Sequence, residues 1–482
     1  MIDKQALSAL SHEEKDALIL QLQETVKRQE TLIQQLEFRV KELEARLSKN
    51  SQNSSKPPSS DGYNKKPAPK SQRQKSGKKP GGQSGHAGSA LEQVENPDFI
   101  VTHEVDKCRQ GCGHSLEGMT KFVEARQEFD LPPIKIQVTE HQIETCKCEG
   151  CGYVNKGKAP NHITQPVQYG ARINAIAVYL GQYQLIPSKR ICETFWDLLG
   201  VKISEGFIYK AYGRCYANLN EYEQSVKGML QCAPVAHFDE SGIRVKKELH
   251  WLHVASTNQL THYAIHKKRG GEAMEAIGIL PEFKGRAIHD HWKAYFAYDC
   301  DHGLCNAHHL RELIYQHEQY DQQWCEQMRS LLLRCNKEIE AAQNQQQGSL
   351  SEEKRLQFEA EYENILAAGL TQIPTIAPSE GKRGKKKQHP ARNLMDRLLG
   401  FKEETLAFMH DFNIPFTNNQ GEQDIRMIKV KQKISGCFRS KRGAQVFCRI
   451  RGYVSTARKQ SHQVFEALIH AVNGSPFVPN TS

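Results

Sequence analysis

The segment 234–268 decides the fold class, because it contains three short stretches with the composition of β-strands. They read PVAHFDESGIRV (234–245), LHWLHVAST (249–257) and LTHYAIHKK (260–268). Each is rich in β-branched, aromatic or other apolar residues, and only a few residues separate one stretch from the next. Closely spaced strands of this kind are typical of an antiparallel meander, so the sequence predicts three neighbouring antiparallel strands.

The pattern after the meander alternates between helix and strand. We predict a helix at GEAMEAIGIL (271–280), a strand at RAIHD (286–290), and a strand-like piece, GLCNA (303–307), leading into a helix that begins HHLREL (308–313). Three antiparallel strands followed by this alternation is the order of a ribonuclease-H-like fold. Residues 310–400 are predicted to be a largely helical insertion before the last helix.

The length and charge of the chain set limits on its function. A chain of 482 residues is long enough for about three domains. Its net charge of +10 indicates a polyanionic partner such as nucleic acid. No apolar run approaches the ~20 residues that span a bilayer, and the start, MIDKQALSAL, lacks the features of a secretory signal. In a reducing cytosol the 14 cysteines would be thiols or metal ligands.

The amino-terminal region, 1–50, is predicted to be a coiled-coil helix. Residues 12–49 contain no Gly or Pro, and mostly apolar residues recur there at alternating intervals of four and three. The seam of this repeat consists of Leu22, Val26, Gln29, Ile33, Leu36, Val40, Leu43 and Leu47. β-branched residues at one seam position and Leu at the other favour a parallel two-stranded leucine zipper, and hence a homodimer or higher oligomer. The alternative is an amphipathic helix packed on its own domain.

Residues 51–98 are rich in Ser, Pro, Gly and Lys and carry no hydrophobic pattern through most of their length. Such a segment buries too little apolar surface to offset the entropy of ordering, so we predict a disordered basic linker. It serves either as a solubilising spacer or as an arm along DNA phosphates.

Two cysteine pairs within 99–160 predict a zinc-binding module. Cys108 and Cys112 form the first pair, in CRQGC, and Cys148 and Cys151 form the second, in CKCEGC. Four thiolates hold Zn²⁺ tetrahedrally and leave no open coordination position, so the site is expected to be structural. Cys146 is an alternative to Cys148, and unliganded buried thiols are the alternative to a metal site.

Residues 165–230 are predicted to be helical. An apolar helix ends at Gly200, a short turn follows, and Ser204 is a plausible N-cap of the next helix. This outline fits a DNA-binding helix-turn-helix, and it fits equally an αα-hairpin that does not contact DNA.

Three carboxylates stand at comparable places in the predicted elements. Asp239 is expected to end the first strand, Asp290 to end the later strand, and Glu422 to lie near the start of a helix. In a ribonuclease-H-like sheet these places converge on one edge. Oxygen donors suit Mg²⁺ or Mn²⁺, and two such ions roughly 4 Å apart serve in-line displacement at phosphorus. The catalytic domain is placed at 231–430.

The segment from Arg426 to Arg451 contains nine Lys or Arg residues and no Asp or Glu. We predict that seven of these cations bind DNA: Arg426, Lys429, Lys431, Lys433, Arg439, Lys441 and Arg442. Lys429 lies two helical turns after Glu422, so both side chains are expected to face the same way. The alternative is the ordinary preference of helices for acids at their start and cations at their end. Residues 431–482 are described as a basic carboxyl-terminal segment.

The motifs HFDESGIRV, LHWLHVAST, IHDHWKAYF, LCNAHHLREL and NNQGEQDIRMIKVKQKISGCFRS closely resemble the DDE transposases of the insertion-sequence-66 family. The resemblance implies that Asp239, Asp290 and Glu422 are the catalytic triad and that Lys429 is the basic residue that follows the glutamate in many such enzymes. It implies a cytoplasmic, nucleoid-associated prokaryotic protein that binds terminal inverted repeats, cleaves at the 3′ ends and joins them to target DNA. It also implies possible companion proteins of the same element.

Two other functions fit parts of the sequence. One is a catalytically inactive regulator that binds DNA through its zipper and zinc module, and the other is a ribonuclease-H-like nuclease. Cys305, His308 and His309 suggest either a metal site or, as we prefer, a strand-to-helix joint packed against the active site. Trp292 and Tyr295 suggest either stacking on a displaced base or ordinary packing.

Overall fold

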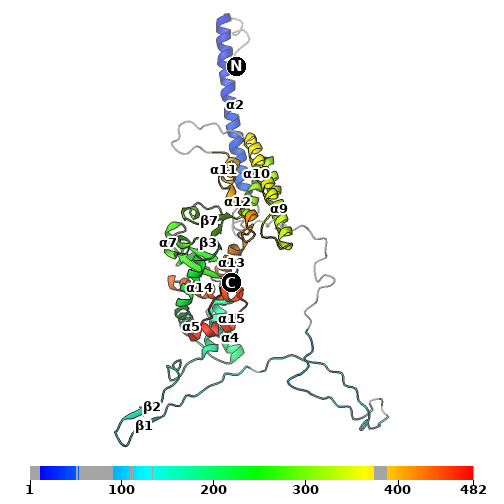
Figure 1. The fold of residues 1–482 in the computed structure, drawn as a ribbon, viewed down its shortest axis with the longest axis vertical. Helices are drawn as coiled ribbons and strands as arrows, with labels where there is room; N and C mark the ends of the chain where they lie inside the picture. The colour runs from blue at the N-terminus through cyan, green and yellow to red at the C-terminus, as the bar shows by residue number, and fades with distance from the viewer. Residues whose placement is uncertain are drawn as a thin grey trace. The chain divides into compact units, whose positions relative to one another are not determined.

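The computed structural model describes most of the chain (Figure 1). The described residues are 11–49, 53, 91–108, 110, 112–132, 134–373 and 388–480. They divide into two compact units, one built from residues up to 69, 160–193 and 203–482, the other from 70–159 and 194–202. Most of the predicted linker, 51–98, lies outside the described residues, so its predicted disorder stays a prediction.

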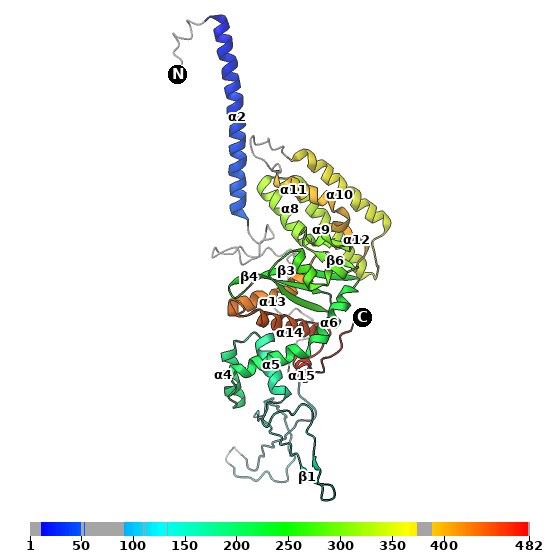
Figure 2. The same ribbon diagram turned by 90° about the vertical axis from the view of Figure 1, so that its left-hand side faces the viewer.

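A mixed sheet of five strands forms the centre of the first unit (Figure 2). The strands are β3 (Val235–Val245), β4 (Glu248–Ser256), β5 (Thr261–His266), β6 (Arg286–His289) and β7 (Asp301–Leu304). Their order is β5-β4-β3-β6-β7; the first three pair antiparallel, and β6 and β7 continue the sheet in parallel from β3. The predicted meander and both later strands are confirmed.

A two-residue turn sets the register of β3 and β4. Lys246 and Lys247 both have positive φ, 50° and 71°, as in the type I′ turns whose twist matches that of the flanking strands. Pairing starts at Val245 with Glu248 and continues back along β3. Because side chains alternate between the faces of a strand, this register places Ile243 and Val245 together in one buried cluster.

Helices α13 (Asn419–Ser435) and α14 (Lys441–Lys459) pack on this sheet, α13 against β3 and β4 and α14 against β5. Their apolar side chains join those of the strands in one core, which includes Ile425, Ile428 and Phe447. Helix α15 (Val464–Asn473) follows and packs on α14.

The expectation that the chain's last helix follows the insertion directly is therefore wrong in one respect, because α13 is followed by two more helices. The segment described as a basic carboxyl-terminal segment, 431–482, is largely folded. Buried apolar residues of α14 lie between its cations, at Ala444, Val446, Phe447, Cys448 and Ile450. The high count of basic residues in the segment conceals this apolar face.

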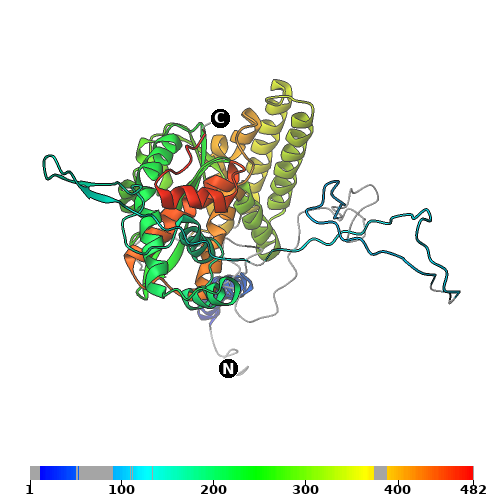
Figure 3. The same cartoon turned by 90° about the horizontal axis from the view of Figure 1, so that it is seen from below.

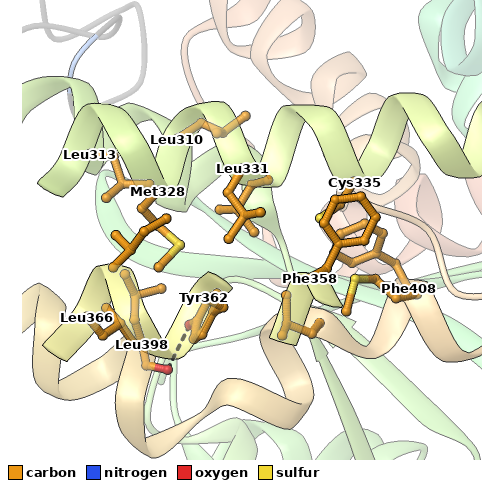
Figure 4. Close-up of a cluster of buried hydrophobic side chains, with 14 of the residues drawn as sticks. Leu310, Leu313, Met328, Leu331, Cys335, Phe358, Tyr362, Leu366, Leu398 and Phe408 are labelled. Carbon is orange, nitrogen blue, oxygen red and sulfur yellow. Dashed lines mark hydrogen bonds between the residues drawn. The ribbon is translucent and has the colours of Figure 1, made fainter. Parts of the chain in front are cut away.

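The region predicted as a helical insertion, about 310–400, is largely helical. It contains α8 (Asn306–Tyr320), α9 (Gln323–Asn344), α10 (Glu352–Gln372), α11 (Pro390–Gly400) and α12 (Lys402–His410). The green-to-yellow helices α8, α9 and α10 run side by side (Figure 3). Their core is closed by Tyr362, whose hydroxyl donates to the Leu398 carbonyl at 2.8 Å (Figure 4). Ile288 of β6 belongs to the same cluster, so the insertion and the sheet share a core.

The region 165–230 is helical, as predicted. Its elements are α3 (Ala171–Val178), the π-turn η2 (Tyr179–Tyr183), α4 (Ser188–Leu199), α5 (Glu205–Asn218) and α6 (Asn220–Gln231). Ser204 is the N-cap of α5, since its hydroxyl accepts a hydrogen bond from the Phe207 amide at 3.2 Å. Three shorter elements complete the fold: α7 (Gly271–Ile277), η3 (Leu280–Glu282) and η4 (Tyr295–Ala297).

The amino-terminal helix α2 (His12–Ser48) begins with a capping box formed by Ser11 and Glu14. Its carboxyl end packs on α8, where the Tyr315 hydroxyl donates to the Ala45 carbonyl at 2.7 Å. The apolar residues of its heptad seam remain about half exposed or more: Leu22, Val26, Ile33, Leu36, Val40, Leu43 and Leu47. Packing on the chain's own domain thus accounts for one end of the helix and leaves the seam uncovered.

Gly285 lies just before β6, where the chain packs closely against the backbone that leads into β3, and replacing it tests this close packing. A Cβ at that position would lie 2.6 Å from the Pro234 carbonyl oxygen and closer still to that of Ala233. We expect G285A to lower the free energy of unfolding by about 1–3 kcal/mol, the usual cost of overpacking. G348A is the matched control, because a Cβ at Gly348 meets nothing within 4 Å. Guanidinium denaturation measures both, and equal stability of the two variants would contradict the packing described.

Candidate active site

Asp239 lies in the middle of the central strand. The expectation that it ends the first strand is wrong, because the residues after it continue to pair with β4, from Glu240 opposite His253 to the turn. The Asp239 Oδ1 accepts a hydrogen bond from the Glu240 amide at 2.8 Å. The carboxylate is therefore fixed on the most central backbone segment of the sheet.

Asp290 follows the last residue of β6, as expected from the sequence. The parallel register of β3 and β6 ends with His237 opposite Ile288, so Asp290, two residues further, is level with Asp239. Adjacent strands lie about 4.8 Å apart. The Trp292 amide donates to the Asp290 Oδ1 at 3.0 Å and holds that carboxylate in place. The backbone alone thus brings the two aspartates to neighbouring positions.

Glu422 lies in the first turn of α13, also as expected. The start of this helix is tied to the sheet by Asn418, which is 2% exposed. The Asn418 Nδ2 donates to the Phe238 carbonyl at 2.8 Å, and its Oδ1 lies 2.7 Å from the His237 Nδ1. Its backbone amide donates to the Cys305 Sγ at 3.1 Å. One side chain and one amide therefore place Glu422 beside β3 and the end of β7.

The acids form an electrostatically unfavourable cluster. Burial raises the pKa of Asp239 well above its ordinary value, and the charges of Glu240, Asp290 and Glu422 raise it further. Burial also raises the pKa of Asp290. Within the described residues neither aspartate forms an ion pair with a cationic side chain. A divalent cation between the carboxylates would offset both the cost of burying their charges and the repulsion between them.

Glu422 has close neighbours on the side of α8. In the part of the chain that the structure describes, one group of potential metal ligands has all its ligand atoms within 4.8 Å of one another: Cys305, His308 and Glu422. The triad of Asp239, Asp290 and Glu422 is not brought as close as that. The Glu422 Oε1 lies 3.7 Å from Arg311 and 3.9 Å from the His308 Nδ1. Burial, followed by Arg311, lowers the pKa of His308 to about 4, so His308 is neutral at pH 7.

The structure agrees with the preferred interpretation of LCNAHHLREL as a strand-to-helix joint beside the site. Cys305 lies between β7 and α8, and it and His308 have possible ligand atoms within 4.8 Å of those of Glu422, so the geometry also permits a metal site here. His309 fits the packing interpretation, because it is buried and its Nδ1 lies 3.1 Å from the Asn306 Oδ1. Tyr295 also packs: it is 2% exposed and donates its hydroxyl to Glu240, so the suggestion that it stacks on a base is wrong.

The seven predicted DNA-binding cations are not equally exposed. Five are exposed: Arg426, Lys433, Arg439, Lys441 and Arg442. Lys431 is half-buried, and so is Lys429, whose Nζ lies 3.5 Å from the Gly242 carbonyl and within the electrostatic range of Asp239. Two further cations of the run are internal, since Arg449 pairs with Glu223 at 2.7 Å and Arg451 is buried.

The second compact unit contains the cysteine module. A short hairpin of β1 (Thr145–Lys147) and β2 (Val154–Lys156) carries the turn in which Cys148 and Cys151 approach each other. The backbone amides of Cys151 and Gly150 and then the Cys151 side chain lower the pKa of Cys148. Cys146 lies within β1, and its Sγ contacts the Lys147 carbonyl instead.

The first pair is arranged in the same way. The backbone amide of His114 and then the Cys108 side chain lower the pKa of Cys112. In each pair, backbone amides and the neighbouring thiol lower the pKa of one cysteine, which favours its thiolate form. Across the described residues the two pairs do not meet in one close group of four.

Comparison with known families identifies the family of the chain. The sequence model of the transposase IS66 family matches residues 166–446, which is more than half of the chain. The chain belongs to the IS66 family of transposases. The zinc-finger binding domain of transposase IS66 matches residues 106–152, and a family of unknown function matches residues 3–92. No curated protein matches the sequence.

The matched regions of this IS66-family transposase contain both groups of candidate residues. The transposase match includes Asp239, Asp290 and Glu422, and the zinc-finger match includes both cysteine pairs, which supports a structural zinc ion in the protein. Within the described residues, none of the helices combines the length and the apolar character needed to cross a lipid bilayer.

Sequence reasoning missed two features of the candidate site. Asn418 precedes a helix, so its residue type suggests an N-cap, but its side chain bonds to β3 instead of capping α13. Glu240 follows Asp239 directly and is buried with Arg269 and Tyr295, a pairing that no local pattern indicates. Both features depend on contacts between residues that are distant in the sequence.

The raised pKa of Asp239 predicts that its buried charge destabilises the folded protein when no divalent ion is bound. An acid whose folded pKa is raised lowers stability as the pH rises from its ordinary value through the raised one. Near pH 7 and in chelator, D239N should therefore unfold at a higher temperature than the parent. D299N is the control, because the Asp299 carboxylate is fully exposed. A thermal melt that shows D239N equal to or below the parent would contradict the unfavourable burial of this acid.

Proposed function

We propose that this transposase cuts and joins DNA at a site formed by Asp239, Asp290 and Glu422 in a ribonuclease-H-like core. One observation supports it above the others: two aspartates lie level on neighbouring parallel strands, and a third acid is tied beside them through Asn418. The strand order, with three antiparallel strands continued in parallel by β6 and β7, agrees with that core.

The donor set fits hard divalent ions, Mg²⁺ or Mn²⁺. The Asp239 and Asp290 carboxylates form no ion pair within the described part of the chain, and the Glu422 Oε1 is buried without a hydrogen-bond partner. Oxygen ligands of this kind are the ones that Mg²⁺ prefers. When bound, such ions would activate the attacking oxygen and stabilise the leaving oxygen of an in-line displacement at phosphorus.

The chain's own residues then orient the reactants. Asp239 and Asp290 would hold the ions from the sheet, and Glu422 would contribute a ligand from α13. His308, being neutral, and Arg311 restrict the rotation of the Glu422 side chain from the other side. The same residues serve both steps of the reaction, hydrolysis that exposes a 3′-hydroxyl at each element end and attack of that hydroxyl on target DNA.

DNA binding involves the cations around α13 and α14. The exposed residues Arg426, Lys433, Arg439, Lys441 and Arg442 supply charge for the phosphates of the terminal inverted repeats. Phosphate contacts of this kind set the position of DNA without reading its sequence. Helix α5, which Ser204 caps at its start, is the candidate for base contacts.

Oligomerisation involves the uncovered seam of α2. A single helix with a row of half-exposed Leu, Ile and Val residues loses that exposure only by pairing with another helix. A second copy of the same helix supplies a matching seam, and a dimer would bring two active sites to the two ends of an element.

The finger domain is proposed to hold Zn²⁺ through Cys108, Cys112, Cys148 and Cys151, with metal binding joining the two pairs. Metal analysis of purified protein should then find about one zinc per chain, and C148S should lose it. C146S is the matched control, because Cys146 is the neighbouring thiol and contacts its own strand. Zinc retained by C148S and lost by C146S would contradict this ligand set.

Replacing Asp290 tests the catalytic site. D290N should lower both end cleavage and strand joining more than about 100-fold, since even outer partners of metal ligands are worth about 10- to 100-fold. The assay supplies linear element ends, a target plasmid and Mg²⁺, and separates joined from nicked products on a gel. D299N is the control and should keep full activity, because Asp299 is an exposed aspartate.

The products also separate the other functions. Equal activity of D290N and the parent would contradict catalysis by these acids and indicate an inactive DNA-binding regulator. Nicked DNA without joined products would indicate a nuclease.

A further inference from the structure

Arg269, which follows β5, is held by a buried acid next to the active site. Its Nε and Nη2 donate to the Glu240 Oε1 at 2.7 and 2.5 Å. The other oxygen of Glu240 accepts the hydroxyl of Tyr295. The Glu240 side chain is 1% exposed and Tyr295 is 2% exposed, so the acid that holds the arginine cannot move freely.

Two indole rings fix the plane of the same guanidinium. The Arg269 Cζ lies 4.1 Å from the centroid of the Trp292 ring and 5.0 Å from that of Trp251. A guanidinium that is stacked on aromatic rings and bonded along one edge has lost most of its conformational freedom before any ligand arrives. The residue is thus preorganised for binding.

The opposite edge of the guanidinium faces solvent. The Arg269 side chain is 36% exposed, although its partner Glu240 is almost fully buried. Its Nη1 makes no hydrogen bond to any residue that the structure describes. Lys268, the residue before it, is an exposed cation. A purely structural ion pair would not require this open, charged edge.

The residues that hold Arg269 are the ones that hold the catalytic aspartates. The Glu240 amide donates to the Asp239 Oδ1 at 2.8 Å, and the Trp292 amide donates to the Asp290 Oδ1 at 3.0 Å. The guanidinium is also near enough to Asp290 to oppose the rise in its pKa that burial causes. Trp292, whose ring lies against the guanidinium, is two residues after Asp290, so Arg269 occupies a fixed position near that aspartate.

We propose that Arg269 binds one phosphate of the DNA backbone adjacent to the phosphodiester that is cut, and that Glu240 and Trp292 position it. An arginine fork matches the oxygens of a phosphate group and binds it with two hydrogen bonds. The inference rests on the proposed function, because a phosphate reaches this position only if the aspartates act on DNA.

The test compares the parent with a variant of Arg269 on DNA substrates in which single phosphates are replaced by uncharged groups. The full chain is assayed in single turnover with Mg²⁺ on duplexes that carry one element end, each with one phosphate near the cut replaced by methylphosphonate. R269K, which keeps a cation for Glu240, should cleave unmodified DNA about 10- to 100-fold more slowly than the parent. At one position the methylphosphonate should slow the parent by a similar factor and slow R269K no further.

A merely structural role predicts a different pattern. Every methylphosphonate would then slow R269K by the same factor as the parent, and that result would overturn the proposal. If R269K melts at a lower temperature than the parent, the paired variant E240Q/R269Q, which leaves no unpaired charge, should give the same loss at the same position. K267Q is the control, because Lys267 is an exposed neighbour of Arg269 that pairs with Glu248. It should show the same sensitivity to each methylphosphonate as the parent.

Failure of the proposed function has its own signature. A parent protein that cuts no unmodified element end contradicts catalysis, and the inference about Arg269 falls with it. A parent that cuts DNA but whose sensitivity to methylphosphonate is unchanged in R269K contradicts only the phosphate contact.

Discussion

The attachment of α13 to the sheet through Asn418 is the interaction on which the site depends. The Asn418 side chain bonds to the Phe238 carbonyl and to His237, and its amide donates to Cys305. These bonds are buried, and a buried polar group left without its partner costs about 1–3 kcal/mol. They join the segment before Asp239, the end of β7 and the turn before Glu422. Without them α13 would still cover the apolar face of the sheet, but the position of its first turn would not be set.

The same design holds acids together that would otherwise repel each other. Asp239 and Asp290 are placed by backbone register and by one amide hydrogen bond each, so their side chains need no cationic partner from the chain. Glu240, which is buried next to Asp239 in the chain, pairs with Arg269 and accepts a hydrogen bond from Tyr295. Glu240 therefore has its hydrogen-bond and charge partners inside the fold, whereas Asp239 and Asp290 remain available to bind ions.

The elements were predictable from the sequence because their signals are local. Short apolar stretches and tight spacing gave the strands, and NNQGEQDIR gave the start of α13. Asp239 was misplaced at a strand end because ESG resembles a turn, whereas pairing with β4 continues through it. Of the two acids that open the basic run, Asp424 pairs with Lys459 at 2.7 Å and links α13 to α14. Separating its structural role from the role of Glu422 required the contact across 35 residues, which no local pattern contains.

The position of the bound ion tests the three-carboxylate site most directly. Crystals of the full chain with Mn²⁺ and element-end DNA would reveal manganese by its anomalous scattering. We expect manganese bonded to oxygens of Asp239 and Asp290, with Glu422 as a further ligand, and distances near those of oxygen-bound divalent ions. Manganese held by Cys305 and His308, with none at the two aspartates, would contradict the site.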